Sequence, residues 1–555
     1  MELNSIVESL DNKSILVTGA TGFLAKLFVE KLLRVQPNLK QLFLLIRAPD
    51  SAAVTQRFHN EVIGKEVFRV LKKKHGVEFN SFISEKVTPV SGDVTLENLG
   101  INDSEMTKKL WSEVDFVANF AATTNFDERY DVALDINTMG AKHVLEFSKK
   151  CVKLKLLLHI STAYVWGEKS GLLLENPLRK GETLNGTISE KLDSQVEMKL
   201  ISQRLKELKA EQLPKKQETI AMKEFGLQRA RLFGWPNTYV FTKAMGEMEI
   251  GELVESRNDL PVVILRPTII TSTFREPFPG WIEGVRFANI VYIFELAALW
   301  IPRITMKSMI LSLIYNLQLR WSELIVVFDK YRTIDSIILG AGKGKVKCFL
   351  ARADVIMDLI PGDMVVNAAI VAMVGHANQR SDDRQQFIYQ VGSSARAPLE
   401  TTRLRNYVYN YFSKNPLIST SSIGKSNGKP MLPIQVSYPF IFPTMASFLT
   451  FLYVTHMLPL KGLRLVNAVF CDYFRDYCND AERKITFITK LVKLYEPYIL
   501  FKGIFDDLNT ERLRIAARGN AAEADTFYFD PKCINWDEYF MNTHIPGLVK
   551  YALKY

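Results

Sequence analysis

Residues 14–25 read SILVTGATGFLA, and this stretch decides the fold. The run from Ser14 to Val17 is short and apolar and is closed by a glycine turn, which is typical of a buried strand. Apolar residues then follow at helical spacing from Phe23 to Leu33. The pattern therefore predicts a strand, a tight turn and a helix.

The turn has the form of a dinucleotide site. Gly19 allows the tight bend, Gly22 lets the backbone approach a pyrophosphate, and the small Ala25 permits close packing of the helix, whose N-terminus faces the anion. A glycine turn that binds nothing would show the same spacing, so this segment alone leaves both interpretations open. We assign the following residues of the turn to cofactor binding: Thr18, Gly19, Thr21, Gly22, Phe23 and Leu24.

A second predicted strand, residues 41–46, ends at Arg47. An enzyme that uses NAD usually has an acidic residue here, whereas a guanidinium suits the 2′-phosphate of NADP because it makes paired, charge-assisted hydrogen bonds. The sequence therefore favours NADPH. Arg57 either assists Arg47 or is a surface arginine next to a helix.

Two further predicted strands, residues 86–90 and 114–120, lead into polar or small residues. In a doubly wound parallel sheet these strand ends line the crevice that holds the cofactor. We therefore assign Asp93 and Val94 to the adenine end and Ala121 and Ala122 to the ribose side. The predicted fold class is α/β, a Rossmann-like parallel sheet with helices on both faces.

A catalytic pattern begins after the fifth predicted strand, residues 156–160. Ser161 and Thr162 follow this strand, and Tyr239 and Lys243 occur much later at a spacing that puts both on one face of a helix. A nearby ammonium stabilises phenolate and lowers the pKa of tyrosine from about 10, so the phenol becomes a usable proton donor. The Tyr-x-x-x-Lys spacing alone is common by chance. Its occurrence in a chain that also has the glycine turn and Thr162 favours a catalytic role.

Taken together, these residues resemble the extended short-chain dehydrogenase/reductases, and more closely the plant alcohol-forming fatty acyl-CoA reductases of the male-sterility type. The resemblance spans nearly the whole chain. It is carried by TGATGFLAK (18–26), FAATTNFDERYDVALDINTMGA (120–141), HISTAYVWGEKSG (159–171), GWPNTYVFTKAMGE (234–247), LRPTIITSTFREPFPGW (265–281), IYQVGSS (388–394) and FYFDPK (527–532).

The resemblance implies that Thr162, Tyr239 and Lys243 are catalytic. It also implies that Asn137 is the structural asparagine of the family and that Pro267 to Ile270, with Pro267 and Ile269 as cofactor contacts, is the nicotinamide-side loop. The implied reaction is the four-electron reduction of a long-chain fatty acyl-CoA to a primary alcohol, by way of an aldehyde, with two NADPH consumed and CoA released. A reductase that stops at the aldehyde, and an inactive reductase-like protein that binds lipid, are the alternatives.

Other chemistries lack support. The five cysteines are scattered and none lies in a motif that would activate a thiolate. We find no Gly-x-Ser-x-Gly, His-Glu-x-x-His or Cys-x-x-Cys, so we expect no esterase site and no metal. The formal charge of +10 would suit CoA phosphates or an anionic membrane, but nucleic-acid binding has no supporting motif. The sequence does not indicate an oligomeric state.

At 555 residues, 47% hydrophobic and 23% charged, the chain is expected to form more than one globular domain. We divide it into a reductase domain (1–398), a linker (399–430) and a helical C-terminal domain (431–555). Within the first, residues 179–231 form a charged insertion of amphipathic helices, either a solvated addition or a basic lid that contacts CoA.

Residues 430–460 contain no Asp, Glu, Lys or Arg, and prolines divide them. The proline-free piece 444–458 is fifteen residues long, shorter than the roughly twenty that span a bilayer. We therefore expect residues 431–460 to lie on a membrane surface or to form a buried helix. With no plastid transit peptide recognised at the start, the expected location is the cytosolic face of the endoplasmic reticulum membrane, or else the cytosol.

Residues 287–331 depart from the family pattern. In relatives, the stretch that resembles 280–286 runs directly into one like 333–336, whereas about 45 apolar and aromatic residues intervene here. Such a segment is either an apolar hairpin that dips into a membrane or the translation of a retained intron, because AT-rich sequence encodes these residue types. A retained intron beside the acyl site could abolish activity.

Overall fold

The computed structural model describes residues 5–186, 192–255, 260–283, 334–344, 346, 348–377, 386–418, 433–469 and 475–553. The atypical segment 287–331 lies outside these residues, as do residues 419–430 of the expected linker.

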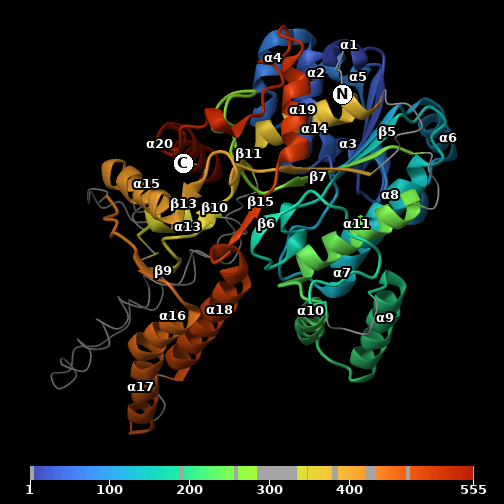
Figure 1. Ribbon diagram of the computed structural model, residues 1–555. Helices are drawn as coiled ribbons and strands as arrows, with labels where there is room; N and C mark the ends of the chain where they lie inside the picture. Colours follow the sequence, from blue (N-terminus) through green and yellow to red (C-terminus); the bar gives the residue numbers. More distant parts are fainter. Residues whose placement is uncertain are drawn as a thin grey trace. The chain divides into compact units, whose positions relative to one another are not determined.

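A seven-stranded parallel sheet organises the N-terminal two thirds of the chain (Figure 1). Its strands follow each other across the sheet in the order β12 (Gln386–Val391), β7 (Val262–Pro267), β5 (Leu156–Ile160), β4 (Phe116–Asn119), β1 (Ser14–Thr18), β2 (Gln41–Ile46) and β3 (Val87–Ser91). The chain moves outward from β1 in one direction and from β4 in the other, so the topological switch point lies between these two strands. The predicted doubly wound fold is confirmed.

Helices cover both faces of the sheet. Figure 1 shows α2 (Phe23–Val35), α14 (Gly362–Ala377) and α19 (Leu508–Arg518) on one face, and α8 (Gly140–Ser148) and α11 (Thr238–Glu255) on the other. The core beneath α8 and α11 includes fully buried aliphatic residues: Leu16, Val117, Leu157 and Ile264 from the sheet, Val144 and Leu145 from α8, and Ile250 from α11. Strands buried on both faces explain the continuous apolar runs in the sequence.

Further elements complete the reductase portion. Its remaining helices are α1 (Ile6–Ser9), α3 (Ser51–Arg57), α4 (Arg69–His75), α5 (Phe79–Lys86), α6 (Ser104–Glu113), α7 (Tyr130–Leu134), α9 (Ser194–Ala210) and α10 (Lys215–Leu232). Two short parallel pairs join β8 (Ile269–Thr271) to β11 (Leu359–Pro361) and β6 (Gly171–Leu173) to β15 (Gly503–Phe505). The expected helical insertion is therefore the pair α9 and α10, which Glu197 and Arg229 connect at 2.5 Å.

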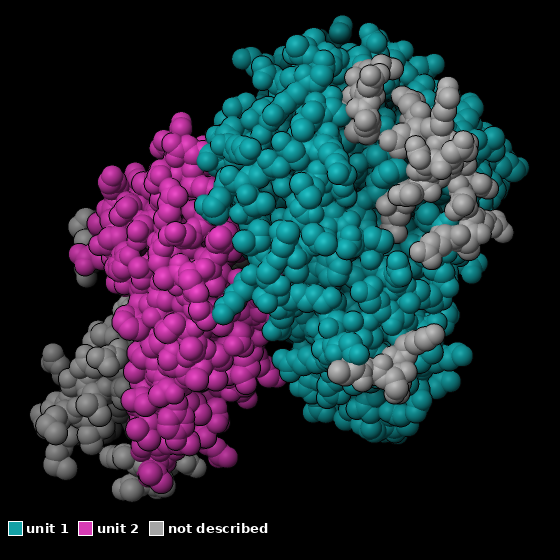
Figure 2. All heavy atoms as spheres, viewed as in Figure 1, with its two compact units in different colours: residues 1–282, 358–398, 502–534 teal, residues 283–357, 399–501, 535–555 magenta. Residues whose placement is uncertain are grey.

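The chain divides into two compact units (Figure 2). Unit 1 comprises residues 1–282, 358–398 and 502–534, and unit 2 comprises 283–357, 399–501 and 535–555. We had divided the sequence into consecutive domains, whereas residues 502–534 belong to unit 1 although they lie far along the chain. The two units interleave in sequence.

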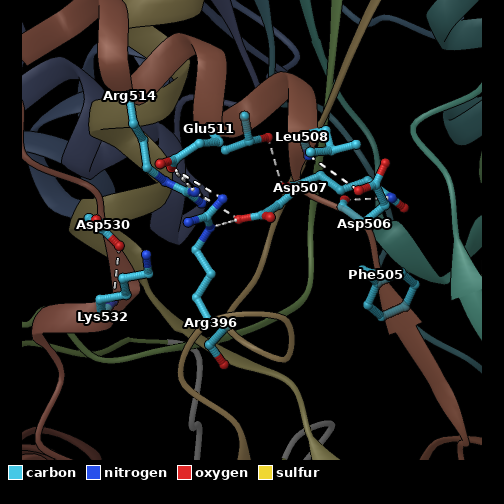
Figure 3. Close-up of polar contacts among 12 residues, drawn as sticks. Arg396, Phe505, Asp506, Asp507, Leu508, Glu511, Arg514, Asp530 and Lys532 are labelled. Atoms are coloured by element: carbon cyan, nitrogen blue, oxygen red, sulfur yellow. Dashed lines mark hydrogen bonds and ion pairs between the residues drawn. The ribbon is translucent and has the colours of Figure 1, made fainter.

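An ionic network explains why 502–534 belongs to unit 1 (Figure 3). Arg396 pairs with Asp507 and reaches Glu511 at 3.3 Å, while the buried Arg514 binds Asp507 at 2.7 Å and Glu511 at 3.0 Å. Parallel pairing of β15 with β6 and packing of α19 on α14 add to these contacts. These interactions connect segments that are distant in sequence, so no local pattern predicts them.

Unit 2 is mainly helical, with short strands. Its elements are α13 (Ile334–Gly342), β9 (Cys348–Leu350), β10 (Ile356–Met357), β13 (Leu399–Glu400), α15 (Thr401–Lys414), β14 (Phe440–Phe442), α16 (Met445–Leu452), α17 (Leu458–Val469), α18 (Arg475–Ile499), α20 (Trp536–Glu538) and α21 (Ile545–Gly547). Strand β9 pairs with β14, and β10 pairs with β13.

The apolar segment of unit 2 differs from our expectation in one respect. Pro459 bounds the proline-free piece 444–458, but α16 continues through a π-helical turn, Tyr453–Met457, directly into α17, which contains this proline. In a regular α-helix the ring of Pro459 would clash with the backbone carbonyl of the residue four positions earlier. The π turn contains that residue, and its wider backbone relieves the clash. Among the described residues, no helix has both the length and the apolar character needed to cross a bilayer.

Candidate active site

The glycine turn lies at the switch point of the sheet. Gly19 has φ +68°, and a Cβ there would lie 2.6 Å from the amide nitrogen of Ala121, so conformation and space both require glycine. The Gly22 amide donates to the Gly19 carbonyl at 2.8 Å, and α2 begins at the next residue. The amides of the first helical turn have no partner within the helix, so the turn fits a pyrophosphate.

The other assigned residues of the turn surround this helix start. Thr18 ends β1, and its hydroxyl donates to Asn119 Oδ1 at 2.6 Å. The Thr21 carbonyl accepts from Lys26 Nζ at 2.9 Å. Phe23 stacks on Trp281 with ring centroids 5.0 Å apart, and Leu24 follows it in the first turn of α2.

Arg47 and Asp93 lie together at the carboxyl ends of β2 and β3. The Arg47 side chain is 68% exposed, and its guanidinium lies 3.8 Å from an Asp93 carboxylate oxygen, a distance that leaves it available to another anion. The other Asp93 oxygen accepts from the amide and hydroxyl of Thr95. Val94, the next residue, is buried.

Arg57 is held by a neighbouring carboxylate. Two of its nitrogens donate to Glu61, each at 2.9 Å, and a third donates to the Arg47 carbonyl. These i,i+4 bonds on one helical face account for the position of its guanidinium. A role for Arg57 in cofactor binding stays a prediction.

The loop after β4 connects the glycine turn to the catalytic helix. The Ala121 amide donates to the Thr18 hydroxyl at 3.3 Å, and Ala122 follows it. Asn137, in the π-helical turn Asp135–Met139, accepts from the Thr123 amide at 3.0 Å and donates to the Thr242 hydroxyl at 3.0 Å. Asn137 therefore joins this loop to α11.

Thr162, Tyr239 and Lys243 come together at the carboxyl edge of the sheet. Thr162 is buried at the end of β5, and its side chain hydrogen-bonds with Tyr239, which extends from the first turn of α11. Phe126 stacks on the Tyr239 ring with centroids 5.4 Å apart. Lys243, one turn further along α11, donates to the Ile160 carbonyl at 2.7 Å.

The pKa of Tyr239 moves in the direction opposite to our expectation. Burial raises it to about 12, and the hydrogen bond with Thr162 opposes this rise only in part. We had expected Lys243 to lower it. The Lys243 ammonium is directed at the Ile160 carbonyl and at His159 Nε2, at 3.4 Å, so it stabilises the phenolate less than the spacing suggested.

Lys243 lies in a buried polar environment. Its side chain is 1% exposed, and burial lowers its pKa to about 8, against the opposing charge of Glu247. His159 is equally buried, and burial together with the Lys243 charge lowers its pKa well below the usual value. Imidazole at this position is therefore neutral near pH 7.

The loop expected on the nicotinamide side is fixed by backbone hydrogen bonds. Pro267 ends β7, the Thr268 amide donates to the Val391 carbonyl at 3.1 Å, and Ile269 pairs with β11. The Ile269 amide also donates to the carbonyl of the buried Asp358 at 3.2 Å. Asp358 in turn accepts from the Ser393 amide at 2.7 Å, so its side chain joins this loop to the turn after β12.

The described cysteines have inert surroundings. Burial raises the pKa of the Cys151 thiol to about 12 and that of Cys348 to about 11. A protonated thiol is a poor nucleophile. In the part of the chain that the structure describes, no group of three or more His, Cys, Asp and Glu side chains could hold a metal.

Sequence reasoning missed four residues that shape the site: Asn119, Phe126, His159 and Asp358. Asn119 and His159 had a recognisable signal, because each is a polar residue inside an otherwise apolar strand. A buried polar side chain in a parallel strand needs a hydrogen-bond partner, so such residues point to internal polar contacts. Phe126 and Asp358 lie in irregular segments and carry no such signal.

Comparison with known proteins agrees with the geometry. Two family models, both described as male sterility protein, match residues 17–315 and 455–555. The alcohol-forming fatty acyl-CoA reductase of Simmondsia chinensis is 48% identical over 552 residues, which cover 100% of this chain and 99% of that protein. Fatty acyl-CoA reductase 1 of Arabidopsis thaliana is 46% identical, and the match covers 100% of both chains.

Solved structures support the fold. The terminal R domain from the myxalamid biosynthetic pathway superposes with a TM-score of 0.51 at 15% identity, and the match covers 98% of this chain and 92% of that domain. A reductase domain of a non-ribosomal peptide synthetase from Mycobacterium tuberculosis gives 0.50 at 14% identity, covering 99% and 96%. The 46% and 48% identity to the plant reductases over the full length, together with the two family models, shows that the chain belongs to the male sterility protein family, the family of the plant fatty acyl-CoA reductases.

Proposed function

We propose that this protein is an NADPH-dependent oxidoreductase that reduces long-chain fatty acyl-CoA to the primary alcohol. The observation that carries the proposal is the meeting of Thr162, Tyr239 and Lys243 beside the glycine turn. The names of the full-length plant relatives supply the substrate class. Overall, one acyl-CoA, two NADPH and two protons give one alcohol, one CoA and two NADP⁺.

The side chains of the site supply protons and stabilise charge. When bound, NADPH supplies a hydride for each of the two reductions. Thr162 and Tyr239 donate hydrogen bonds to the carbonyl oxygen of the thioester, where negative charge develops. Because burial raises the pKa of Tyr239 to about 12, its phenol is protonated at neutral pH and serves as the proton donor.

The first reduction produces a hemithioacetal, because Tyr239 protonates the oxygen that the hydride addition leaves negative. Its C–S bond then breaks, the hydroxyl proton is lost, and CoA leaves as the thiol, which yields the aldehyde. In the second reduction Tyr239 protonates the aldehyde oxygen to give the alcohol. Lys243, one helical turn away, stabilises the transient phenolate.

A direct reduction of the thioester fits the surroundings of the cysteines better than a covalent route. The four described cysteines are Cys151, Cys348, Cys478 and Cys533. Burial raises the thiol pKa of each, so none offers a thiolate at neutral pH.

Substitution of Tyr239 by Phe tests the proposal. The variant keeps the ring that stacks on Phe126 but loses the proton donor, so fatty alcohol formation from acyl-CoA and NADPH should fall at least about 100-fold. Mass spectrometry of the lipid products measures alcohol and aldehyde together. Tyr438→Phe, at an exposed tyrosine, is the matched control and should leave the rate unchanged. Full alcohol output from Tyr239→Phe would refute the proposal.

The proposal also includes a preference for NADPH over NADH, which rests on Arg47. Its guanidinium is exposed at the end of β2, with no close bond to the carboxylate 3.8 Å away. Arg47→Ala should raise the KM for NADPH about 10- to 100-fold, since it removes a charge-assisted bond, and should leave the KM for NADH unchanged. Arg352→Ala, at a partly exposed arginine paired with Asp354, is the control. Equal use of NADH and NADPH by the unaltered protein would contradict this part.

We also propose that the continuous helix α16–α17 of unit 2 rests on a membrane surface. Its exposed apolar side chains include Tyr453 (45%), Val454 (53%), Leu458 (53%) and Leu465 (77%). Lys461 Nζ lies 5.1 Å from the centre of the Tyr453 ring, an arrangement in which a lysine can reach lipid phosphates while its stem stays with apolar groups. A substrate that partitions into lipid suits such a position, and the proposed location is the cytosolic face of the endoplasmic reticulum membrane.

Flotation with vesicles that contain anionic lipid tests the membrane proposal. The double variant Leu458→Lys, Leu465→Lys should lose most vesicle binding, because it puts two charges into the apolar face. Ile515→Lys, at a residue of α19 that is 60% exposed, is the matched control and should bind like the unaltered protein. Equal flotation of all three proteins would refute a membrane role for this helix. Fractionation of cells that express them tests the location.

A further inference from the structure

A chain of buried polar groups runs beneath the active site from α11 to the glycine turn. Lys243 Nζ lies 3.4 Å from His159 Nε2, and His159 Nδ1 lies 3.0 Å from Asn119 Nδ2. Asn119 Oδ1 accepts from the Thr18 hydroxyl at 2.6 Å. All four side chains are 2% exposed or less. The chain crosses three adjacent strands, β5, β4 and β1.

The hydrogen bonds fix the orientation of the Asn119 amide. Its Oδ1 atom accepts from the Thr18 hydroxyl and, at 3.3 Å, from the Ala121 amide, so this atom is the oxygen. The other end, Nδ2, is a donor and faces His159 Nδ1, which must accept. A neutral imidazole with Nδ1 as acceptor carries its proton on Nε2.

The Nε2 proton therefore points at Lys243. An ammonium has three donors and no acceptor, so a protonated Lys243 would place donor against donor at 3.4 Å. A neutral amine offers a lone pair and would accept the Nε2 proton instead. The arrangement thus favours the neutral amine, although the Ile160 carbonyl accepts one Lys243 proton at 2.7 Å in either form.

We propose that His159, held in one tautomer by Asn119 and Thr18, is a positioning residue that sets the protonation state of the catalytic Lys243. The inference rests on the proposed function, in which Lys243 acts as an ammonium beside the cofactor and Tyr239. It assigns a role to His159 and Asn119, which lie next to the three catalytic residues but take no part in the proposed reaction steps.

The other charged and titratable groups around Lys243 are accounted for. Glu247, one turn further along α11, raises the pKa of Lys243, but Arg266 of β7 binds this carboxylate at 2.5 and 3.0 Å, which reduces its influence. Tyr239, one turn earlier, is protonated because burial raises its pKa. His159 on β5 is therefore the neighbour whose hydrogen-bonding state a neutral substitution, His159→Gln, can change without adding or removing a charge.

Two substitutions reverse the contact that His159 makes with Lys243. Asn119→Asp keeps the shape and converts the donor that faces Nδ1 into an acceptor, so the imidazole proton moves to Nδ1 and Nε2 becomes an acceptor for the ammonium. His159→Gln can present its amide oxygen to Lys243 directly. Both variants should keep Lys243 protonated to higher pH. His75→Gln, in α4, alters a histidine that stacks on Phe82 of α5 and is the matched control.

Calorimetric titration of NADP⁺ between pH 7 and pH 9, without acyl-CoA, is the test. If only the ammonium form of Lys243 binds well, the affinity of the unaltered protein should fall about tenfold over this interval, because the lysine pKa is about 8. In Asn119→Asp and His159→Gln the affinity for NADP⁺ should fall less than about twofold between pH 7 and pH 9. The pH at which alcohol formation declines on the alkaline side should rise in parallel.

The outcomes separate the two proposals. If either variant that folds shows the same tenfold loss as the unaltered protein and the control, His159 has only a structural role and the inference fails. If NADP⁺ binds the unaltered protein at no pH, the proposed function fails instead. Asn119→Asp also adds a negative charge, which favours the ammonium by itself. If His159→Gln does not fold, the neutral Asn119→Leu, which removes the donor that faces Nδ1, decides the question: the tenfold loss should again shrink to less than about twofold.

Discussion

At the scale of the residue, Lys243 shows how catalysis and stability conflict. Its ammonium is needed beside Tyr239, yet the side chain is 1% exposed and burial lowers its pKa from the ordinary 10.5 to about 8. Below pH 8 lysine is charged in both the folded and unfolded states, and the folded state bears the full desolvation penalty. Between pH 8 and 10.5 the folded state binds fewer protons, so this penalty disappears as the pH rises.

Lys243→Met should therefore be inactive and more stable. The shift from 10.5 to about 8 corresponds to roughly 3 kcal/mol, from which about 1 kcal/mol is subtracted for the lost bond to the Ile160 carbonyl. Without ligand at pH 7 the variant should exceed the unaltered protein by about 2 kcal/mol. Thermal unfolding at pH 7 and pH 9.5 measures the difference, which should shrink at the higher pH.

Lys215→Met is the control for this experiment, because Lys215 is exposed in α10. Its effect on the unfolding temperature should be small and the same at both pH values. A Lys243→Met protein that is less stable than the original at pH 7 would show that the buried ammonium is well compensated, contrary to the lowered pKa.

The sequence predicted the reacting side chains better than their surroundings. Tyr239 and Lys243 are recognisable from their spacing, because four residues form about one helical turn. The direction of the Tyr239 pKa was not predictable, since it depends on Phe126 and on the contacts of Lys243, which come from other elements. Spacing along one helix determines which groups are close, whereas burial by other elements determines their pKa.

At the scale of the element, a buried ion pair attaches α11 to the sheet. Glu247 of α11 and Arg266 of β7 are both fully buried, with bonds of 2.5 and 3.0 Å between them. A third guanidinium nitrogen donates to the Asn176 carbonyl at 3.0 Å. This pair fixes the position of the helix that carries Tyr239 and Lys243.

Glu247→Gln should destabilise unit 1 by about 3 to 5 kcal/mol, because it leaves the Arg266 guanidinium buried without a counter-charge. Thermal unfolding measures the loss. Glu252→Gln, further along α11, is the matched control: its partner Lys180 is exposed to solvent, so the loss should stay below about 1 kcal/mol. Equal losses from the two substitutions would contradict the importance of the buried pair.

Elements of the sheet were the most predictable part of the fold. The predicted ranges 41–46 and 156–160 coincide with β2 and β5, because apolar runs between turn residues mark fully buried parallel strands. The helix that passes through Pro459 was not predictable in the same way. A proline normally ends a helix, and only the π turn before it allows α17 to follow α16 without a break.

At the scale of the whole molecule, the order of segments along the chain does not follow the two units. The composition of the C-terminal third suggested one continuous helical domain from residue 431, yet residues 502–534 supply β15 and α19 to unit 1. The contacts responsible are pairings with β6 and α14, more than 100 residues away in sequence. Hydrophobic patterns report which face of an element is buried but not which distant element covers it.

This interleaving predicts that a chain ending at residue 398 cannot form a stable reductase unit. Its buried Glu175 would lose the Asn509 amide, bound at 2.5 Å, and the Thr510 hydroxyl, at 2.9 Å, and Gln390 would lose the Asp506 carbonyl, at 3.0 Å. Each of these lost hydrogen bonds costs about 1 to 3 kcal/mol, and the uncovered apolar face of α14 adds to this. The total approaches the 5 to about 15 kcal/mol that stabilises a typical domain.

The truncated chain should therefore aggregate or bind no NADP⁺. A matched chain in which a Gly/Ser linker replaces residues 399–501, so that 502–534 is retained, should show a cooperative thermal transition and bind NADP⁺, because it restores the partners of Glu175 and Gln390. Calorimetry and differential scanning fluorimetry compare the two chains with the full-length protein. A soluble chain 1–398 that binds NADP⁺ as tightly as the full protein would mean that the sheet and its first helices suffice, and that β15 and α19 only cover a core already stable without them.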